Sequence, residues 1–322
     1  MNDEQRMLAD MAGDLFTNLG PDAAMKDHWS AIEEVALTGL LLPEDKGGFG
    51  GSWGDALIAF RLAGYHALGL PVVEAVVAAA LTQRPEGRGT IASRTEGTVS
   101  GVTFTGRISG ACLASGADYI VAPCPEGGSM VLSVADAKVE AHENLAGEAR
   151  DGLVCTGTSV ERIEADVFAF GALARVAQIA GALDAALEKA VNYANERQQF
   201  GRPLAKFQAV QQNLATFACE AAAANCAAMG AAQAMSRGEA PFEIAAAKLR
   251  ANRAVGIGTA LAHQVHGAIG FTEEYPLHPL TRRLWAWRSE FGNDSVWAEK
   301  LGQTIVARGA ENFWADLTAL TG

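Results

Sequence analysis

Apolar residues recur at helical spacing in the first third of the chain. The pattern from Leu8 to Phe16 predicts an amphipathic helix, and Asn2 followed three residues later by Gln5 indicates a capping box at its start. Ser30 followed by Glu33 predicts a second capping box and a second helix. Helical periodicity returns between Leu57 and Leu81. An N-terminal helical domain is therefore expected over residues 1–83.

The pattern changes near Gln83. Residues 84–101 are rich in glycine, threonine and charged side chains, which favours a linker. Short β-branched runs then alternate with turn residues, at the spacing of a small barrel or sandwich. We expect a strand-rich domain over residues 84–164, with strand candidates at Val102–Gly106, Asp118–Pro123, Ser129–Val134, Leu153–Gly157 and Thr158–Ile163.

From Asp166 onward the periodicity is helical again. Long helices are expected at Ala172–Glu196, Phe207–Ser236, Glu243–Gly270 and Val296–Leu320. The high alanine content of the second and third allows close helix packing, as in a four-helix bundle. The sequence thus predicts an α+β fold, mainly α, with a C-terminal bundle over residues 165–322.

Composition narrows the functional class. A net charge of −12 over 322 residues argues against nucleic acid and against an anionic membrane surface as partners. The cysteines number five, an odd count, and have no CxxC spacing, which favours free thiols in a reducing compartment. The histidines show no metal-ligand spacing, so no metal site is expected. The N-terminus is polar, and the apolar run near Leu70–Leu81 is interrupted, so we expect a cytoplasmic protein without a membrane span.

One stretch, residues 195–212, combines a helix end, a turn and a new helix. Arg197 closes the first helix, and Gly201 with Pro203 makes the turn. A guanidinium held beside Phe200 can bind a pyrophosphate while the ring covers an apolar ligand face. From the residues alone, a surface arginine at a helix end, next to a buried phenylalanine, is the commoner explanation.

A second stretch, Gln264–Phe271, carries Gln-x-x-Gly-x-x-Gly, and Gly39–Gly50 carries a Pro-Glu turn followed by glycines. With Arg-x-x-Phe-Gly at 197–201, these stretches resemble the acyl-CoA dehydrogenase family. The resemblance implies an N-terminal helical domain, a small truncated β-barrel and a C-terminal four-helix bundle. In that family both C-terminal motifs reach across a dimer interface to FAD. The resemblance therefore implies that FAD is contacted by Arg197, Gln199, Phe200, Gly201, Leu204, Phe207, Gln208, Gln264, Val265, Gly267 and Ala268.

The family oxidises an acyl-CoA to its 2-enoyl thioester. A carboxylate removes the α-proton, and the flavin accepts the β-hydrogen as hydride. The flavin bed of the family is an aromatic-Thr-Glu-Pro-x-x-Gly-Ser segment before the barrel. The stretch between Leu81 and Val102 is short and has no such segment. The resemblance then implies that this chain alone holds flavin poorly.

The catalytic base is displaced as well. If Gly292 marks the register, the family's base position holds Phe291, and Glu290 stands one residue early. The family's alternative base would fall near Gly171, where no carboxylate stands. Glu290 is therefore the one candidate catalytic residue. The plain alternative for Glu290 is solvation, or an ion pair with Arg282 or Arg288.

A chain with both cross-subunit motifs but no flavin-bed segment resembles the short subunits of heteromeric (α2β2) acyl-CoA dehydrogenases of steroid side-chain degradation. The resemblance implies a longer acyl-CoA dehydrogenase subunit as partner, a bulky acyl-CoA substrate such as a steroid-derived one, and an electron-transfer flavoprotein as acceptor. Two alternatives stay open: a self-sufficient homo-oligomeric dehydrogenase that uses Glu290, and a non-catalytic scaffold subunit that has lost flavin.

Overall fold

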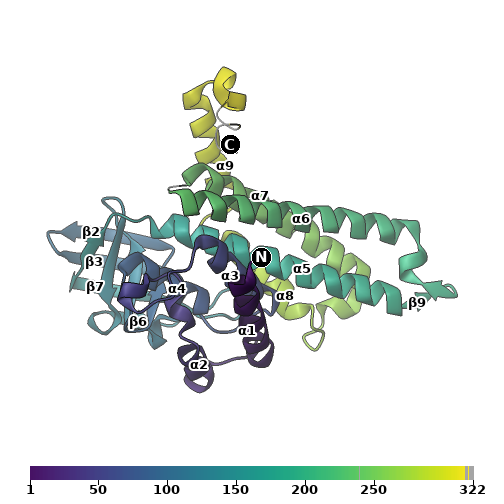
Figure 1. Cartoon of the computed structure of the whole chain (residues 1–322), viewed down its shortest axis with the longest axis horizontal. Helices are drawn as coiled ribbons and strands as arrows, with labels where there is room; N and C mark the ends of the chain where they lie inside the picture. The colour runs from purple at the N-terminus through teal and green to yellow at the C-terminus, as the bar shows by residue number, and fades with distance from the viewer. Residues whose placement is uncertain (239, 316–317, 319–322) are drawn as a thin grey trace.

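The computed structural model describes residues 1–238, 240–315 and 318. Most strands lie at one end of the long axis, and two long helices run from them to the opposite end (Figure 1). The N-terminal helices cover the middle. The mainly helical α+β fold expected from the sequence is confirmed.

Four α-helices build the N-terminal part: α1 (Asp3–Leu19), α2 (Met25–Glu34), α3 (Trp53–Tyr65) and α4 (Val72–Thr82), with the short turns η1 (Leu37–Gly39) and η2 (Glu44–Lys46). The Asn2 capping box is confirmed, because the backbone N–H of Gln5 donates to the Asn2 side chain at 2.8 Å.

Two N-terminal predictions are wrong. Ser30 lies inside α2 and caps nothing, whereas Ser52, which the sequence reading passed over, forms a capping box with Asp55. The single helix expected from Leu57 to Leu81 is two helices, because the chain breaks at Ala67 (φ 49°) and Pro71 cannot donate a helical hydrogen bond.

The β domain consists of two four-stranded sheets, with orders β1-β4-β5-β8 and β2-β3-β7-β6. All pairings are antiparallel except β1 with β4. The sheets enclose a common core that includes Phe104, Ile120, Met130 and Leu153. The strands are β1 (Gly89–Ile91), β2 (Arg94–Ser100), β3 (Thr103–Cys112), β4 (Tyr119–Pro123), β5 (Ser129–Ser133), β6 (Lys138–Glu140), β7 (Arg150–Ser159) and β8 (Glu161–Ile163), with turns η3 (Ala114–Gly116) and η4 (Val134–Asp136).

The linker expected at residues 84–101 is wrong, since this stretch forms β1 and β2. β2 pairs with β3 along its whole length, from Arg94 opposite Ser109 to Ser100 opposite Thr103. It is an edge strand whose residues are mostly exposed, so it carries no hydrophobic alternation. Pairing with a neighbour, rather than local pattern, makes it a strand.

The C-terminal bundle contains the long helices expected near residues 172–196, 207–236 and 243–270. Its helices are α5 (Val167–Glu196), α6 (Gln208–Arg237), α7 (Pro241–His266), α8 (His278–Ser289) and α9 (Asp294–Arg308), with β9 (Gln198–Gln199), β10 (Arg202–Pro203), η5 (Leu204–Lys206), η6 (Gly267–Phe271) and η7 (Ala310–Asn312). α8 was not expected as a helix. The predicted helix Val296–Leu320 is too long, because α9 ends before Gly309 (φ 85°), and Leu320 lies outside the described residues.

α5 is the central helix of the fold. By length and composition, α5 and α6 could each span a membrane, but 78% of the apolar window of α5 is buried inside the fold. One hydrophobic core joins the N-terminal helices to the bundle, with members such as Phe16, Phe60, Val76 and Leu183. Secondary structure changes class between Thr82 and Gly89 and between Ile163 and Val167. The division into domains at 83 and 164 stays a prediction.

Candidate functional site

The Arg-x-x-Phe-Gly motif forms a hairpin at the end of the bundle farthest from the sheets (Figure 1). Arg197 caps α5, and its carbonyl accepts a hydrogen bond from the Leu204 N–H at 2.9 Å. β9 and β10 pair antiparallel, and the turn needs positive φ at Phe200 (51°) and Gly201 (78°). The backbone of Arg197 thus closes the hairpin.

The side chains of this hairpin face outward. Phe200 is 91% exposed, so the buried phenylalanine of the commoner explanation is wrong. The guanidinium of Arg202 lies 4.2 Å from the centre of the Phe207 ring. Within the described part of the chain, no ion pair occupies the guanidinium of Arg197. The hairpin therefore presents an exposed arginine, Arg197, and an exposed ring, Phe200.

The Gln264 motif lies at the same end of the bundle. The His266 ring packs on Tyr193, in the last turn of α5, with 4.7 Å between ring centres. His266 Nδ1 lies 2.7 Å from the Ala262 carbonyl oxygen, so this histidine packs and bonds to backbone. Gly267 has φ 65° with open space around its Cα, as does Gly201. The fold therefore places both motifs at the same end of the bundle.

The predicted cofactor residues differ in their exposure. Val265 is buried in the core, so its side chain faces away from any ligand. Leu204 and Phe207 are half-buried. The others, which are exposed, are Arg197, Gln199, Phe200, Gly201, Gln208, Gln264, Gly267 and Ala268.

Glu290 lies elsewhere, between α8 and the β domain. Its Oε1 accepts hydrogen bonds from Arg150 Nε at 2.8 Å and Asn144 Nδ2 at 2.9 Å, and its Oε2 from Arg175 Nε at 2.7 Å. Burial alone would raise the pKa of Glu290, but the two guanidiniums outweigh burial and hold it well below its usual range. The partners anticipated from the sequence are wrong, since Arg288 pairs with Asp294 and Arg282 donates to the Leu145 carbonyl.

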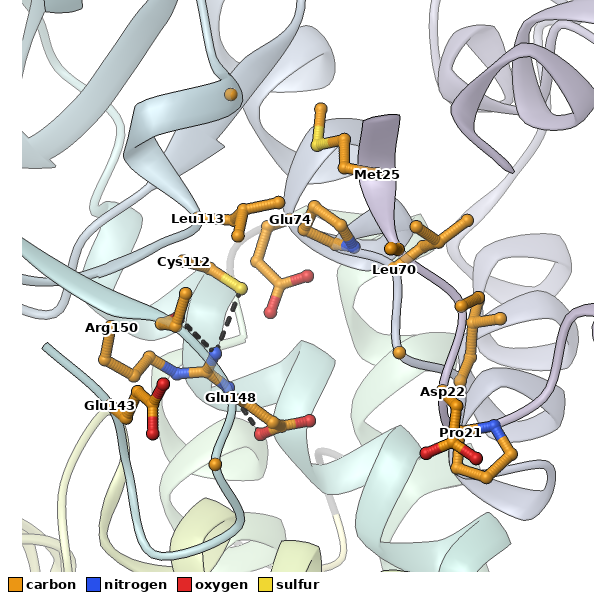
Figure 2. Close-up of a pocket in the computed structure, with 18 of the residues that line it drawn as sticks. Pro21, Asp22, Met25, Leu70, Glu74, Cys112, Leu113, Glu143, Glu148 and Arg150 are labelled. Carbon is orange, nitrogen blue, oxygen red and sulfur yellow. Dashed lines mark hydrogen bonds and ion pairs between the residues drawn. The ribbon is translucent and has the colours of Figure 1, made fainter. Parts of the chain in front are cut away.

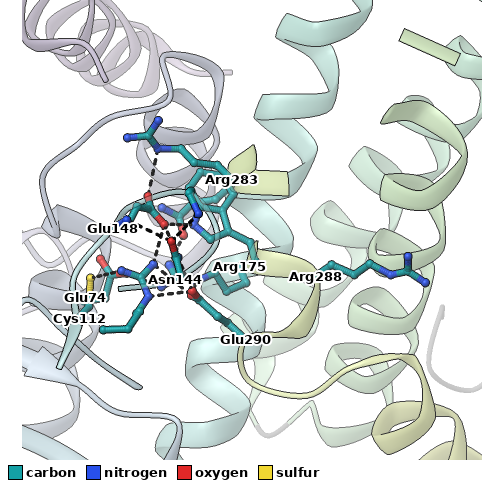
Figure 3. Close-up of polar contacts among 12 residues, drawn as sticks. Glu74, Cys112, Asn144, Glu148, Arg175, Arg283, Arg288 and Glu290 are labelled. Carbon is teal, nitrogen blue, oxygen red and sulfur yellow. Dashed lines mark hydrogen bonds and ion pairs between the residues drawn. The ribbon is translucent and has the colours of Figure 1, made fainter. Parts of the chain in front are cut away.

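Glu290 belongs to a larger buried network, which we call the ion cluster: Glu74, Glu148, Glu290, Arg150, Arg175 and Arg283 (Figure 3). Arg175 Nη2 lies 2.6 Å from Glu74 Oε1, and Arg283 Nε lies 3.0 Å from Glu148 Oε1. The cluster holds three cations and three anions, so its formal charge is zero. Sequence reading missed it, because its members are far apart along the chain.

The two positions at which a catalytic base was expected, 291 and 171, hold no carboxylate, and the Phe291 ring fills the space between them. Phe291, at φ 50°, is only 3% exposed. A Cβ added at Gly171 would lie 2.3 Å from Phe291 Cε1, so the ring fills the space over that glycine. Lys248 holds the turn in place, since its Nζ donates to Asn252 Oδ1 at 2.7 Å and to the carbonyl of Gly292 at 3.1 Å. This buried lysine was also missed.

Two cavities flank the ion cluster. The first, of about 650 Å³, has apolar walls that include Met25, Leu70 and Leu113 and a charged floor with Glu74 and Arg150 (Figure 2). The second, of about 610 Å³, is lined by Ser93, Ser109, Trp285 and Glu290. Arg150 lines both.

The hairpin end of the bundle and the region around the ion cluster differ in how well they fit FAD. At the hairpin, a free guanidinium and two open glycines suit a pyrophosphate that approaches from outside. The two cavities and the ion cluster lie between the bundle and the β domain, in a region that we call the crevice. A flavin ring next to a thioester requires one continuous space there, and the ion cluster stands between the two cavities. The crevice of this chain therefore does not fit the ring.

Known proteins share this architecture. Residues 162–306 match the family model described as acyl-CoA dehydrogenase, C-terminal domain. Over 93% of its length the chain is 28% identical to acyl-CoA dehydrogenase FadE34 of Mycobacterium tuberculosis, of which it spans 45%. The chain thus spans less than half the length of the curated relatives that it matches.

Solved structures share the fold. A variant of the Tcur3481-Tcur3483 steroid ACAD superposes with a TM-score of 0.86 at 22% identity, covering 96% of this chain and 99% of that one. A chain of the ChsE4-ChsE5 complex from Mycobacterium tuberculosis gives 0.84 at 20% identity, covering 94% and 97%.

Proposed function

We propose that this chain, which matches the acyl-CoA dehydrogenases in its C-terminal domain and in its fold, is the complementary subunit of a heteromeric FAD-dependent acyl-CoA dehydrogenase. Its hairpin and Gln264 motif complete an FAD site that a longer dehydrogenase subunit holds. Its own crevice carries no catalysis.

One observation carries the proposal: the ring of Phe291 lies on Gly171. These are the two positions at which the family resemblance places a base, and here one is aromatic and the other has no side chain. Glu290, the remaining carboxylate, is engaged by two guanidiniums. A carboxylate whose charge is stabilised in this way is a weak base, because it accepts a proton only at the expense of both pairs.

The chain's own residues have a limited task in this scheme. Bound FAD would supply the hydride acceptor for oxidation of the acyl thioester. Arg197 would hold the pyrophosphate, and the exposed ring of Phe200 would cover an apolar part of the cofactor. Gln208 and Gln264 offer hydrogen bonds to the adenosine side. All four side chains are exposed at the end of the bundle, where a partner subunit can reach them.

A protein partner is supported by helix α6. Its apolar window is only 28% buried, although its composition is that of a core helix. Exposed apolar surface of this kind marks interaction sites. The partner, a longer acyl-CoA dehydrogenase subunit in an α2β2 assembly, follows from the family resemblance. Two of the solved neighbours are named as paired proteins, and one of these as a steroid ACAD.

The substrate and acceptor complete the proposal. We take the substrate to be a bulky acyl-CoA, such as a steroid-derived one, and the acceptor to be an electron-transfer flavoprotein, in the cytoplasm. Glu290 as the base of a self-sufficient enzyme is the second candidate, supported only by its place one residue from the family's base position.

The test is co-expression with longer acyl-CoA dehydrogenase chains from the same genome, followed by flavin absorbance of each purified species. We expect flavin in the mixed complex, and none in this chain alone. A yellow isolated chain that is bleached by an acyl-CoA would contradict the proposal and favour the self-sufficient enzyme. A long chain that holds as much flavin alone as in the complex would favour the scaffold subunit.

A further inference from the structure

We propose that the ion cluster is a ligand-independent clamp, which fastens the N-terminal helices, the β domain and the bundle to one another across the crevice. The clamp is a property of this chain by itself, so it depends neither on the partner subunit nor on FAD.

Each unit contributes to the cluster, and three ion pairs cross between units. Arg175 of α5 reaches Glu74 of α4 at 2.6 Å. Arg150 of β7 reaches Glu290, after α8, at 2.8 Å. Arg283 of α8 reaches Glu148, in the loop before β7, at 3.0 Å (Figure 3). These pairs therefore bridge the three units.

The pairs are coupled and shielded from water. Arg150 and Arg175 share the carboxylate of Glu290, and the side chain of Arg175 is only 2% exposed. A buried charge left without its partner is strongly unfavourable. Opening one pair therefore strands its neighbours, so the cluster opens as a whole or stays closed.

Among the described residues, the second sheet contributes no buried side chain to the large hydrophobic core. The large hydrophobic core takes its strand residues from β1, β4 and β5, which all lie in the first sheet. β7 lies in the second sheet, and Arg150 at its start reaches the bundle through Glu290. The Arg150–Glu290 pair thus links the second sheet to the bundle directly, in addition to the apolar core that this sheet shares with the first.

The chain contains its own reporters of clamp opening. Cys112 Sγ accepts a hydrogen bond from Arg150 Nη1 at 3.1 Å and lines the first cavity (Figure 2). Cys155 lies inside the β-domain core, 2% exposed. Local opening of the clamp frees Cys112, whereas Cys155 becomes accessible only when the sheets come apart.

The experiment is native-state labelling of the full chain with iodoacetamide, read peptide by peptide by mass spectrometry. In Glu290→Gln we expect Cys112 to react about a hundredfold faster than in the unsubstituted chain, with the Cys155 rate unchanged. Glu74→Gln, which breaks a different pair, is expected to act in the same direction. Glu126→Gln, in an exposed pair with Arg162, is the matched control and should change neither rate.

Two results would overturn the clamp: an unchanged Cys112 rate in both cluster variants, or Cys112 and Cys155 rising together. If neither variant folds, the unsubstituted chain is labelled through a urea series. The clamp then opens before the sheets separate, so Cys112 becomes reactive at lower urea than Cys155. Reactivity of both cysteines in a single transition contradicts it.

Discussion

The free end of the bundle and the crevice beside the β domain use arginine in opposite ways. Arg197 stands at the surface without an ion pair in the part of the chain that is described. Arg150 and Arg175 are buried, and carboxylates engage both of them. A cation left free at a surface costs little and can be kept for a ligand, whereas a buried one must be neutralised within the fold. The contrast separates a binding region from a structural one.

The largest expected effect lies in the crevice. Arg175→Met leaves Glu74 and Glu290 without their common partner, so we expect the free energy of unfolding to fall by about 3–5 kcal/mol in urea denaturation. Arg162→Met, in an exposed pair with Glu126, should cost about 1 kcal/mol or less. Equal losses in the two variants would remove the contrast between crevice and surface.

The second effect concerns the turn that carries Glu290 and Phe291. Lys248→Met removes the amino group that donates to the carbonyls of Trp287, Arg288 and Gly292. We expect a loss of about 1–3 kcal/mol in the free energy of unfolding, because buried carbonyls lose their hydrogen-bond donor. Lys46→Met at an exposed position is the control. A stability equal to that of the control would mean that packing alone holds the turn.

A third effect is expected at the hairpin and spares the fold. Arg197→Ala should weaken FAD binding to the mixed complex by about tenfold to a hundredfold, since a charge-assisted pair to the pyrophosphate is lost. The free energy of unfolding of the isolated chain should stay within about 0.5 kcal/mol. Arg94→Ala, on the exposed edge strand β2, is the control. Unaltered flavin retention in Arg197→Ala would contradict a cofactor role for the hairpin.

The smallest expected effect concerns how the free energy of unfolding depends on pH. Burial alone would raise the pKa values of Glu74 and Glu290, but the guanidiniums of Arg175 and Arg150 lower both below their unfolded values. A carboxylate with a depressed folded pKa contributes stability above its unfolded pKa of about 4.3, and this stability is lost as the pH falls further.

Urea denaturation over about pH 3–7 measures this loss. Glu74→Gln has one cluster carboxylate fewer, so its stability should fall less steeply on acidification than that of the unsubstituted chain. Identical slopes would show that these carboxylates titrate alike in the folded and unfolded states.

The sequence by itself determined the long helices and the two C-terminal motifs. Helical periodicity and capping are local properties, so α1, α5, α6 and α7 could be read from neighbouring residues. The Arg197 hairpin is local too, since a helix end, a glycine and a proline stand within a few residues. The order of helices, strands and helices then gave the fold class.

Only the tertiary structure decided the features that depend on contacts between residues far apart in the sequence. β2 is polar and becomes a strand only because β3 lies beside it. The partners of Glu290 are 115 and 140 residues away, while the nearby arginines considered for it face other groups. The contact of Phe291 with Gly171 likewise joins two ends of the bundle sequence. A buried charge takes whichever partner the fold brings within reach, and no local pattern encodes that choice.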